Sequence, residues 1–227
     1  EGLQIPRMKL YDRGRRNDTL FRLIEENVRS PELVLGDLHA QVSANHAAAQ
    51  RVLDFMRDQR LPDLEDLSRA VTSRTDKLMR QAVRKLPDGV YRDRVQLDGF
   101  DAALEIAVSI EIKGERITID FDGTSAQVPK GINSVLNFTE AFSRYAIKCL
   151  LAPDSPNNDG SFACIRVKAP PASIVNARFP APVGARHLVG LYIPCAIFGA
   201  LADVVPGRIV GDSSVLSALT LSGRDLR

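Results

Sequence analysis

The sequence of 227 residues lacks tryptophan, and aromatic residues make up only 6% of it. So few rings argue against a surface that binds single-stranded nucleic acid by base stacking. Its three cysteines, Cys149, Cys164 and Cys195, form no Cys-x-x-Cys pair and lie in apolar stretches, so we expect reduced, buried thiols. The 30 basic residues nearly balance the 28 acidic ones, which argues against a nucleic-acid-binding arm or a polybasic membrane patch.

Membrane-spanning segments, signal peptides and standard catalytic motifs are missing as well. No run of 18 apolar residues is present, so the sequence predicts no transmembrane helix. The first residues include neither an initiator methionine nor a signal-peptide pattern, and we expect a cytoplasmic chain that begins within something larger. The nucleophile elbow, the P-loop, the His-Glu-x-x-His zinc motif and the dinucleotide fingerprint are all absent, so no standard catalytic motif identifies a reaction.

The first part of the sequence shows helical periodicity. Residues 1–89 predict a helical layer of three helices, bounded by capping residues and by prolines. Pro31 suits the first turn of the longest helix, and the turn Pro87-Asp88-Gly89 ends the layer. The expected helices cover roughly residues 18–30, 31–56 and 63–86.

Residues 90–227 predict an α/β part built on a β-hairpin over 104–122. A two-residue turn at Gly114-Glu115 would place Ile112 opposite Ile117 and Ile110 opposite Ile119, so that all apolar side chains share one face. The fold class is therefore α+β, with a long-helix layer packed on a mainly antiparallel sheet, in one continuous fragment of a larger domain. Further elements are expected at 135–151 (helix), 162–169 (strand), 188–204 (apolar helix) and 213–221 (strand).

The long helix carries polar residues inside its apolar stripe. At 100° per residue, Asp37, Gln41 and Asn45 fall on the same face as the apolar side chains, one turn apart. A buried carboxylate needs a partner, so these residues predict either a polar network that fixes the helix to its neighbours or the wall of a binding cleft. His39 and His46 fall on the opposite face, which we expect to be exposed to solvent.

Two later segments also carry polar groups. Asn157 and Asn158 lie in a Pro-Asn-Asn-Asp-Gly loop, a common turn composition. Arg186 and His187 stand at an expected helix start, where backbone N–H groups, a guanidinium and an imidazole would suit an anion. Arg186 could equally pair with a buried carboxylate such as Asp37, and His187 could be a packed histidine.

Seven short stretches, taken in order, resemble the hydantoinase B/oxoprolinase family. No single stretch is specific, but their order and spacing extend across nearly the whole chain. They are Gly36-Asp37-Leu38 with Ala40-Gln41, Asp120-Phe121 with Gly123-Thr124-Ser125, Lys130-Gly131-Ile132-Asn133, Lys148-Cys149-Leu150-Leu151, Pro156-Asn157-Asn158-Asp159-Gly160, Arg178-Phe179-Pro180-Ala181 and Val183-Gly184-Ala185-Arg186-His187-Leu188.

The resemblance implies an ATP-dependent enzyme that opens cyclic amides such as N-methylhydantoin or 5-oxoproline. ATP would be bound by an A-type partner subunit, and this chain would be an inactive part of the B-type subunit. A divalent metal is implied for the full-length subunit, but the acidic and histidine-rich motif that would bind it is not present here, so no complete metal site is expected. Relatives that carboxylate ketones provide one alternative. A non-catalytic assembly module and a stand-alone small-molecule-binding domain are alternatives of another kind.

The resemblance also implies a division of roles among the polar residues. Catalytic roles are expected for Asp37, Gln41, Arg186 and His187. Substrate-binding roles are expected for Asn45, Asn133, Asn157 and Asn158.

Overall fold

The computed structural model describes residues 5–209. The chain divides into two compact units, Glu1–Ser68 and Arg69–Arg227. This division falls inside the third helix, whereas the sequence pattern changes from helical periodicity to strand alternation after residue 89. The second half of that helix contributes Met79 and Val83 to the core of the C-terminal unit, which explains the difference.

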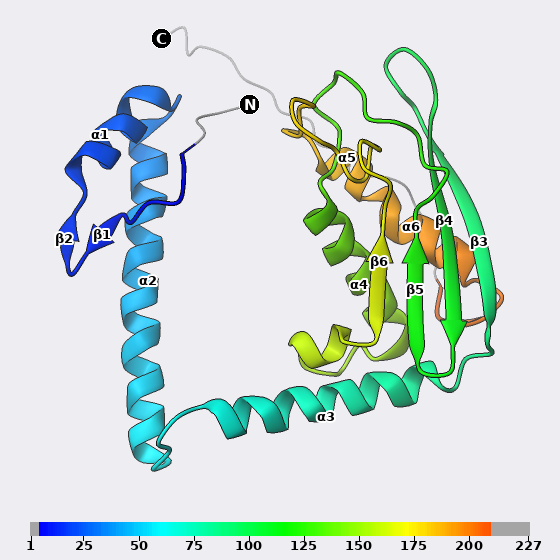
Figure 1. Ribbon diagram of the computed structural model, residues 1–227, viewed down its shortest axis with the longest axis horizontal. Coiled ribbons are helices and arrows are strands. Elements are labelled where there is room, and N and C mark those ends of the chain that lie inside the picture. The colour runs from blue at the N-terminus through cyan, green and yellow to red at the C-terminus, as the bar shows by residue number, and fades with distance from the viewer. Residues whose placement is uncertain (1–4, 210–227) are drawn as a thin grey trace, which may run out of the picture. The chain divides into compact units, whose positions relative to one another are not determined.

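The N-terminal unit is a small helical assembly, coloured blue to cyan in Figure 1. The Asn17 side chain accepts a hydrogen bond from the Leu20 N–H (3.2 Å) and so caps the first helix. Pro31 begins the second helix as predicted. The elements are β1 (Tyr11–Asp12), β2 (Arg15–Arg16), α1 (Asp18–Asn27) and α2 (Pro31–Asp58).

Packing in this unit differs from the sequence prediction. His39 and His46 are exposed, as predicted, although the His39 ring also stacks on the buried ring of Phe21 of α1 (centroids 5.4 Å apart). No residue of α2 is buried, and Val52 and Phe55 of the predicted core face are exposed. The prediction of a buried apolar stripe on α2 is therefore wrong for the described chain, because α1 and the N-terminal hairpin are too short to cover a 28-residue helix.

The C-terminal unit contains a four-stranded sheet in the order β3-β4-β5-β6. The first three strands are antiparallel, and β6 pairs in parallel with β5. The α+β class and the mainly antiparallel sheet are confirmed. The elements are α3 (Glu65–Val83), β3 (Gly89–Leu97), β4 (Leu104–Lys113), β5 (Arg116–Asp120), α4 (Leu136–Leu151), a 3₁₀ turn η1 (Asp159–Phe162), β6 (Ile165–Lys168), α5 (His187–Gly190) and α6 (Tyr192–Ala200).

The predicted hairpin is confirmed residue by residue. Ile112 pairs with Ile117 and Ile110 with Ile119 across the β4–β5 ladder. Gly114 takes a positive φ of 61° in the turn, a conformation that glycine adopts at low cost. The buried side of the ladder forms the centre of the hydrophobic core.

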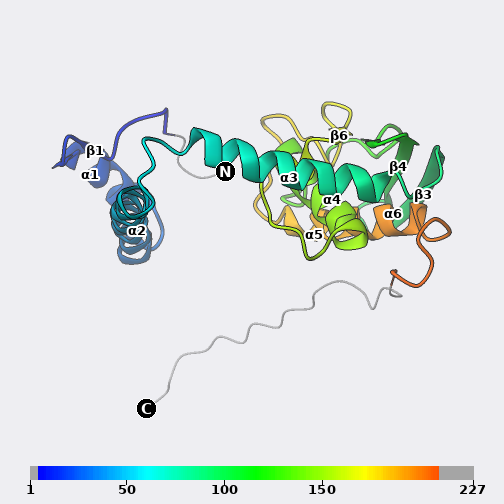
Figure 2. The same ribbon diagram turned by 90° about the horizontal axis from the view of Figure 1, so that it is seen from below.

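Helices α4, α5 and α6 lie on one side of this sheet, as Figures 1 and 2 show. The helix predicted over 188–204 is interrupted, giving α5 and α6. Pro194 has no N–H to donate to the carbonyl four residues earlier, which explains the break. The strand predicted over 162–169 is shortened to β6. The strand expected at 213–221 lies outside the described residues.

Two further observations concern membrane segments and thiols. Within residues 5–209, no helix is long and apolar enough to cross a membrane. All three cysteines are free, and Cys164 is buried as expected, but Cys149 is exposed on α4 and Cys195 is half-buried. The prediction of three buried thiols is wrong for Cys149, because it lies on the side of α4 that faces away from the core.

Candidate functional site

The asparagine loop is built against helix α3. Asn158 accepts hydrogen bonds from the Gly160 N–H (3.0 Å) and from the hydroxyl of the buried Thr75 (2.5 Å). Gly160 is buried, and a Cβ there would lie only 1.9 Å from the Thr72 carbonyl oxygen. Asn158 therefore fixes the loop, whereas the neighbouring Asn157 is exposed and accessible from solvent.

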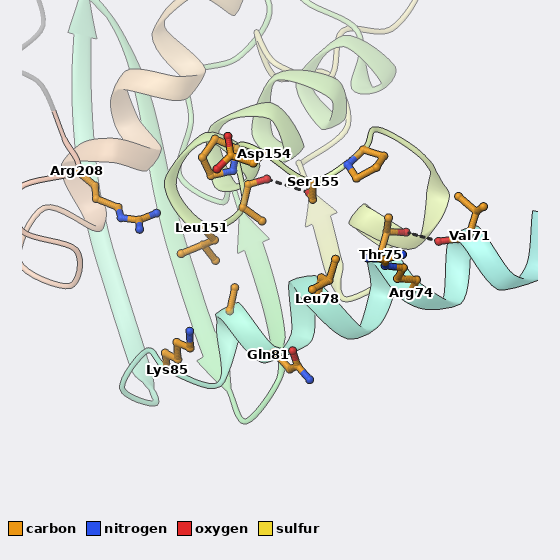
Figure 3. Close-up of a pocket in the computed structure, with 14 residues that line it drawn as sticks. Val71, Arg74, Thr75, Leu78, Gln81, Lys85, Leu151, Asp154, Ser155 and Arg208 are labelled. Carbon is orange, nitrogen blue, oxygen red and sulfur yellow. Dashed lines mark hydrogen bonds between the residues drawn. The ribbon is translucent and has the colours of Figure 1, made fainter.

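A groove of about 730 Å³ lies beside this loop, between α3 and the segment 151–156 (Figure 3). Its apolar lining includes Leu78 from α3 and Leu151 from the end of α4. The far wall is held in place by Lys148, which is buried and donates to the carbonyl oxygens of Pro153 (3.2 Å) and Ser155 (2.5 Å). An ammonium paired with two carbonyls stabilises a turn that has no regular secondary structure.

The groove is basic as well as apolar. Arg74, Lys85 and Arg208 line it, and Asp154 is the one acidic residue among its described lining residues. Arg208 also donates to the Leu150 carbonyl oxygen (2.8 Å), which holds its stem at the groove. Such a surface suits a ligand that presents apolar groups flanked by negative charge.

A second group of predicted residues lies where two loops meet. Asn133 is fully buried, and its side-chain nitrogen donates to the carbonyl oxygens of Val128 (2.7 Å), Lys130 (2.8 Å) and Pro182 (2.9 Å). Its side-chain oxygen accepts from the Val128 N–H (2.8 Å). These bonds use the amide to join the 128–133 loop to the segment that precedes Arg186. The substrate-binding role of Asn133 stays a prediction, and the geometry gives it a positioning role.

Arg186 and His187 both lie on the surface at the start of α5. The Arg186 guanidinium lies 5.7 Å from the centre of the Phe138 ring, a cation–π contact that orients it. The Ala185 and Arg186 N–H groups are already bonded to the Gly131 and Val183 carbonyl oxygens. An anion at this site would therefore be bound by the side chains more than by these two amides.

The polar trio of α2 is found in a different environment from the predicted one. Asp37, Gln41 and Asn45 are all exposed, so the prediction that they are buried is wrong for the described chain. Asn45 lines a hollow of about 470 Å³ together with Met8 and Leu10 of the N-terminal segment. Because the trio and Arg186 belong to different compact units, a cleft that contains both stays a prediction.

Several supporting residues were missed from the sequence. Thr75 and Lys148 hold the loop and the groove wall, yet each looks like an ordinary helix position. The sequence did contain a signal for Lys148. It lies on the apolar side of a helix that ends at a proline, and a lysine there needs hydrogen-bond acceptors beyond the helix end. For Thr75 no signal existed, since its partner Asn158 is 83 residues away.

The described residues contain no group of three or more histidine, cysteine, aspartate or glutamate side chains placed to bind a metal. Asp120, the last residue of β5, accepts from the Asp122 N–H (3.1 Å) and lies 3.9 Å from the Lys168 ammonium. These contacts fit a strand end followed by a turn.

Known proteins match this chain in sequence over nearly all of its residues. The family model described as hydantoinase B/oxoprolinase matches residues 1–227. A protein of Pseudomonas sp. (strain NS671), named as the B component of a D-/L-hydantoinase, is 34% identical over 238 residues, covering 99% of this chain and 40% of that protein. The beta chain of the caprolactamase of Pseudomonas jessenii is 25% identical over 232 residues, covering 100% of this chain and again 40% of the relative.

Solved structures agree with the sequence matches. The crystal structure of the ATP-dependent caprolactamase from Pseudomonas jessenii superposes with a TM-score of 0.85 at 26% identity, covering 92% of this chain and 37% of that one. The nucleotide-free acetone carboxylase structure gives a TM-score of 0.72 at 14% identity, over 88% of this chain and 29% of that one, which shows a shared fold. The chain thus spans about 40% of the length of the curated relatives it matches.

Proposed function

Because this chain belongs to the hydantoinase B/oxoprolinase family, we propose that it forms part of the B-type subunit of an ATP-dependent hydrolase of cyclic amides. Two observations on the caprolactamase of Pseudomonas jessenii support this most strongly. Its beta chain matches this chain in sequence over all of this chain's residues, and the structure of the ATP-dependent enzyme superposes with a TM-score of 0.85. The chain alone would be inactive, since relatives are named as one member of a pair and are longer than this chain.

The chemistry explains why such an enzyme uses ATP. An unstrained amide is a poor electrophile, because its nitrogen is a poor leaving group and resonance stabilises the carbonyl. The γ-phosphoryl group of ATP, bound by an A-type subunit, would be transferred to the amide oxygen, with ADP as the leaving group. Water would then add to the ring carbon, the C–N bond would break with protonation of the nitrogen, and hydrolysis would release the phosphate. The net reaction consumes one cyclic amide, two waters and one ATP and yields the ring-opened acid, ADP and phosphate: one water opens the ring, and the oxygen of the other remains in the product carboxylate or in the phosphate.

Under this proposal the exposed polar residues act on the substrate. Arg186, oriented by Phe138, would stabilise negative charge that develops on the amide oxygen, and His187 beside it would transfer a proton to the leaving nitrogen. Asn157 is the accessible amide of its loop and would bind the ring amide, whereas Asn158 positions the loop.

The polar residues of α2 are proposed to act in the same reaction. Asp37 and Gln41 are proposed to orient the attacking water, and Asn45 to bind substrate. Their exposure in the described chain leaves their side chains available for this role.

We propose that the A-type partner binds ATP, since the sequence of this chain has no phosphate-binding loop. Within residues 5–209 no group of three or more potential metal ligands is gathered, and no step of the proposal is routed through a metal. We also place the enzyme in the cytoplasm, where ATP is supplied.

A second candidate is a subunit of an ATP-dependent ketone carboxylase. The observation that favours it is the fold shared with acetone carboxylase. The two candidates differ in the substrate that activates ATP hydrolysis, because a carboxylase needs a ketone together with bicarbonate. A non-catalytic assembly module would respond to neither.

The test uses the full-length protein that contains this chain, co-expressed with its A-type partner. ATP hydrolysis is measured with N-methylhydantoin, 5-oxoproline, caprolactam, or acetone plus bicarbonate. Stimulation by a cyclic amide is expected. Stimulation by the ketone and bicarbonate alone would favour the carboxylase, and no response to any of them would contradict both enzymatic proposals.

A further inference from the structure

The basic groove beside α3 is not used by the proposed chemistry. It is formed within the C-terminal unit and follows one face of a single helix. Val71 and Leu78 lie seven residues apart and so share one side of the helix, and Lys85 follows them two residues beyond the helix end at Val83. At 1.5 Å per residue the helical part of this row, from Val71 to Val83, is about 18 Å long, which corresponds to about three helical turns.

The apolar part of the groove is open to solvent. Val71 and Leu78 are each 42% exposed, although they face the segment 151–156. Figure 3 shows the Leu78 and Leu151 side chains within this depression, with Lys85 and Arg208 toward one end and Arg74 toward the other. Apolar residues exposed in a row and rimmed by charge mark an interaction surface.

The charge of the rim identifies the kind of partner. Arg74 and Lys85 make no ion pair within the described part of the chain, and Arg208 uses one N–H on a backbone carbonyl. A second copy of this chain docked groove to groove would place these cations against the same cations, which costs free energy. An acidic partner gains from them instead.

We propose that this groove is the docking site for an amphipathic helix of the A-type subunit, with apolar residues on one face and acidic residues on its flanks. The proposal rests on the proposed role as a B-type subunit, since that role requires a companion chain. A helix laid along α3 would bury Val71, Leu78 and Leu151 and pair its carboxylates with Arg74 and Lys85. Lys148 fixes the turn at 153–155, which forms the far wall of the groove, and the partner helix would therefore contact a preformed surface.

The first experiment reverses charge on the groove. The double variant Arg74→Glu/Lys85→Glu of the full-length protein is compared with Lys77→Glu/Lys113→Glu, which makes the same charge change at exposed positions outside the groove. Calorimetry at low and high salt measures the Kd for the purified A-type subunit. The groove variant is expected to weaken binding about tenfold or more and to reduce the salt dependence, while the control stays within about twofold.

A second variant tests the apolar contact without changing charge. Leu78→Ser should speed dissociation of the two subunits, whereas Val90→Ser, at a similarly exposed site on β3, should leave it unchanged. Thermal unfolding of each variant shows that it is folded. Hydrogen exchange on the wild-type complex should show added protection of the α3 amides.

The outcomes separate this proposal from the proposed function. Unchanged affinity in both groove variants, or a wild-type protein that does not bind the A-type subunit, would overturn the docking site. Self-association of the protein that the charge reversal abolishes would also overturn it, in favour of a second copy. If the wild-type pair associates through the groove but no cyclic amide is hydrolysed, docking stands and the function fails. If a cyclic amide is hydrolysed while the groove variants bind the A-type subunit normally, the proposed function stands and the docking site fails.

Discussion

Asn133 illustrates how a residue identified from a motif acquires its role from geometry. It was expected to bind substrate, yet its buried amide makes four hydrogen bonds that join two loops. The sequence indicates an asparagine close to a glycine but not the loop that it meets, because Pro182 is 49 residues away. The sequence therefore singles out Asn133 as a polar residue of interest, but it does not identify the backbone groups to which its side chain is hydrogen-bonded.

Replacing this amide tests the positioning role. Asn133→Ala should lower the free energy of unfolding by about 3 kcal/mol, because it leaves buried backbone groups without partners. Asn137→Ala, at an exposed position on the neighbouring α4, should change it by less than about 0.5 kcal/mol. Chemical denaturation measures both. Equal, small effects of the two substitutions would contradict the role.

Asp37 provides the opposite case at the same scale. Because its side chain is exposed, Asp37→Ala should alter the free energy of unfolding by no more than about 0.5 kcal/mol. In the assembled enzyme the same change should lower kcat about tenfold or more if Asp37 orients water. Asp58→Ala, at the exposed end of α2, serves as the control. Loss of stability and activity together would indicate a structural role instead.

At the scale of elements, an ion-pair network joins α3 to the β4–β5 turn. Arg80 pairs with Asp76 (2.8 Å) and with Glu115 (3.3 Å), and Arg84 also binds Glu115. The hydrogen bond from Arg84, followed by its charge and that of Arg80, lowers the pKa of the Glu115 carboxyl below its ordinary value of 4.5. The network holds the second half of α3 against the hairpin.

This pKa shift predicts a pH dependence. Since the folded-state pKa of Glu115 is depressed, its contribution to stability is present above the ordinary pKa and is lost as the pH falls through the folded value. Glu115→Gln should therefore be less stable than the wild type at about pH 7, with the difference closing as the pH falls below the ordinary pKa of 4.5 and through the lower folded-state pKa. Urea denaturation across this range measures it. A difference that does not vary with pH would contradict the assignment.

Two glycines make a matched pair of tests for how elements pack. Gly160→Ala would push a Cβ into the α3 backbone at Thr72, and we expect a loss of about 2 kcal/mol in stability. Gly36→Ala, in the interior of α2 with no atom within 4 Å, should stabilise the chain by up to about 1 kcal/mol. Melting temperatures that shift in the same direction for both would contradict the described packing.

Elements were predictable where local periodicity determines them. The Asn17 cap, the long helix and the hairpin register follow from spacing within about 30 residues, and each is confirmed, whereas Ser30 precedes the long helix without a capping hydrogen bond from its side chain. The faces of α2 were not predictable in this way. Hydrophobic periodicity identifies a side that requires a partner, but it does not say whether that partner lies in the same 227 residues.

At the scale of the whole molecule, the chain is described as two compact units, and the longest helix of the first exposes its apolar side. The relatives are about two and a half times as long as this chain, as their 40% coverage implies. Such exposure is consistent with a part of a larger subunit. The predicted site residues are divided between the two units.

The most direct test of the account is product formation by the complete pair. The full-length protein and its A-type partner are incubated with a cyclic amide and ATP, and the ring-opened acid and ADP are quantified together. We expect equal amounts of the two products, and neither ring opening nor amide-stimulated ADP formation when either protein or ATP is omitted. Ring opening without ATP, or no ring opening by the assembled pair with any of the cyclic amides, would contradict it.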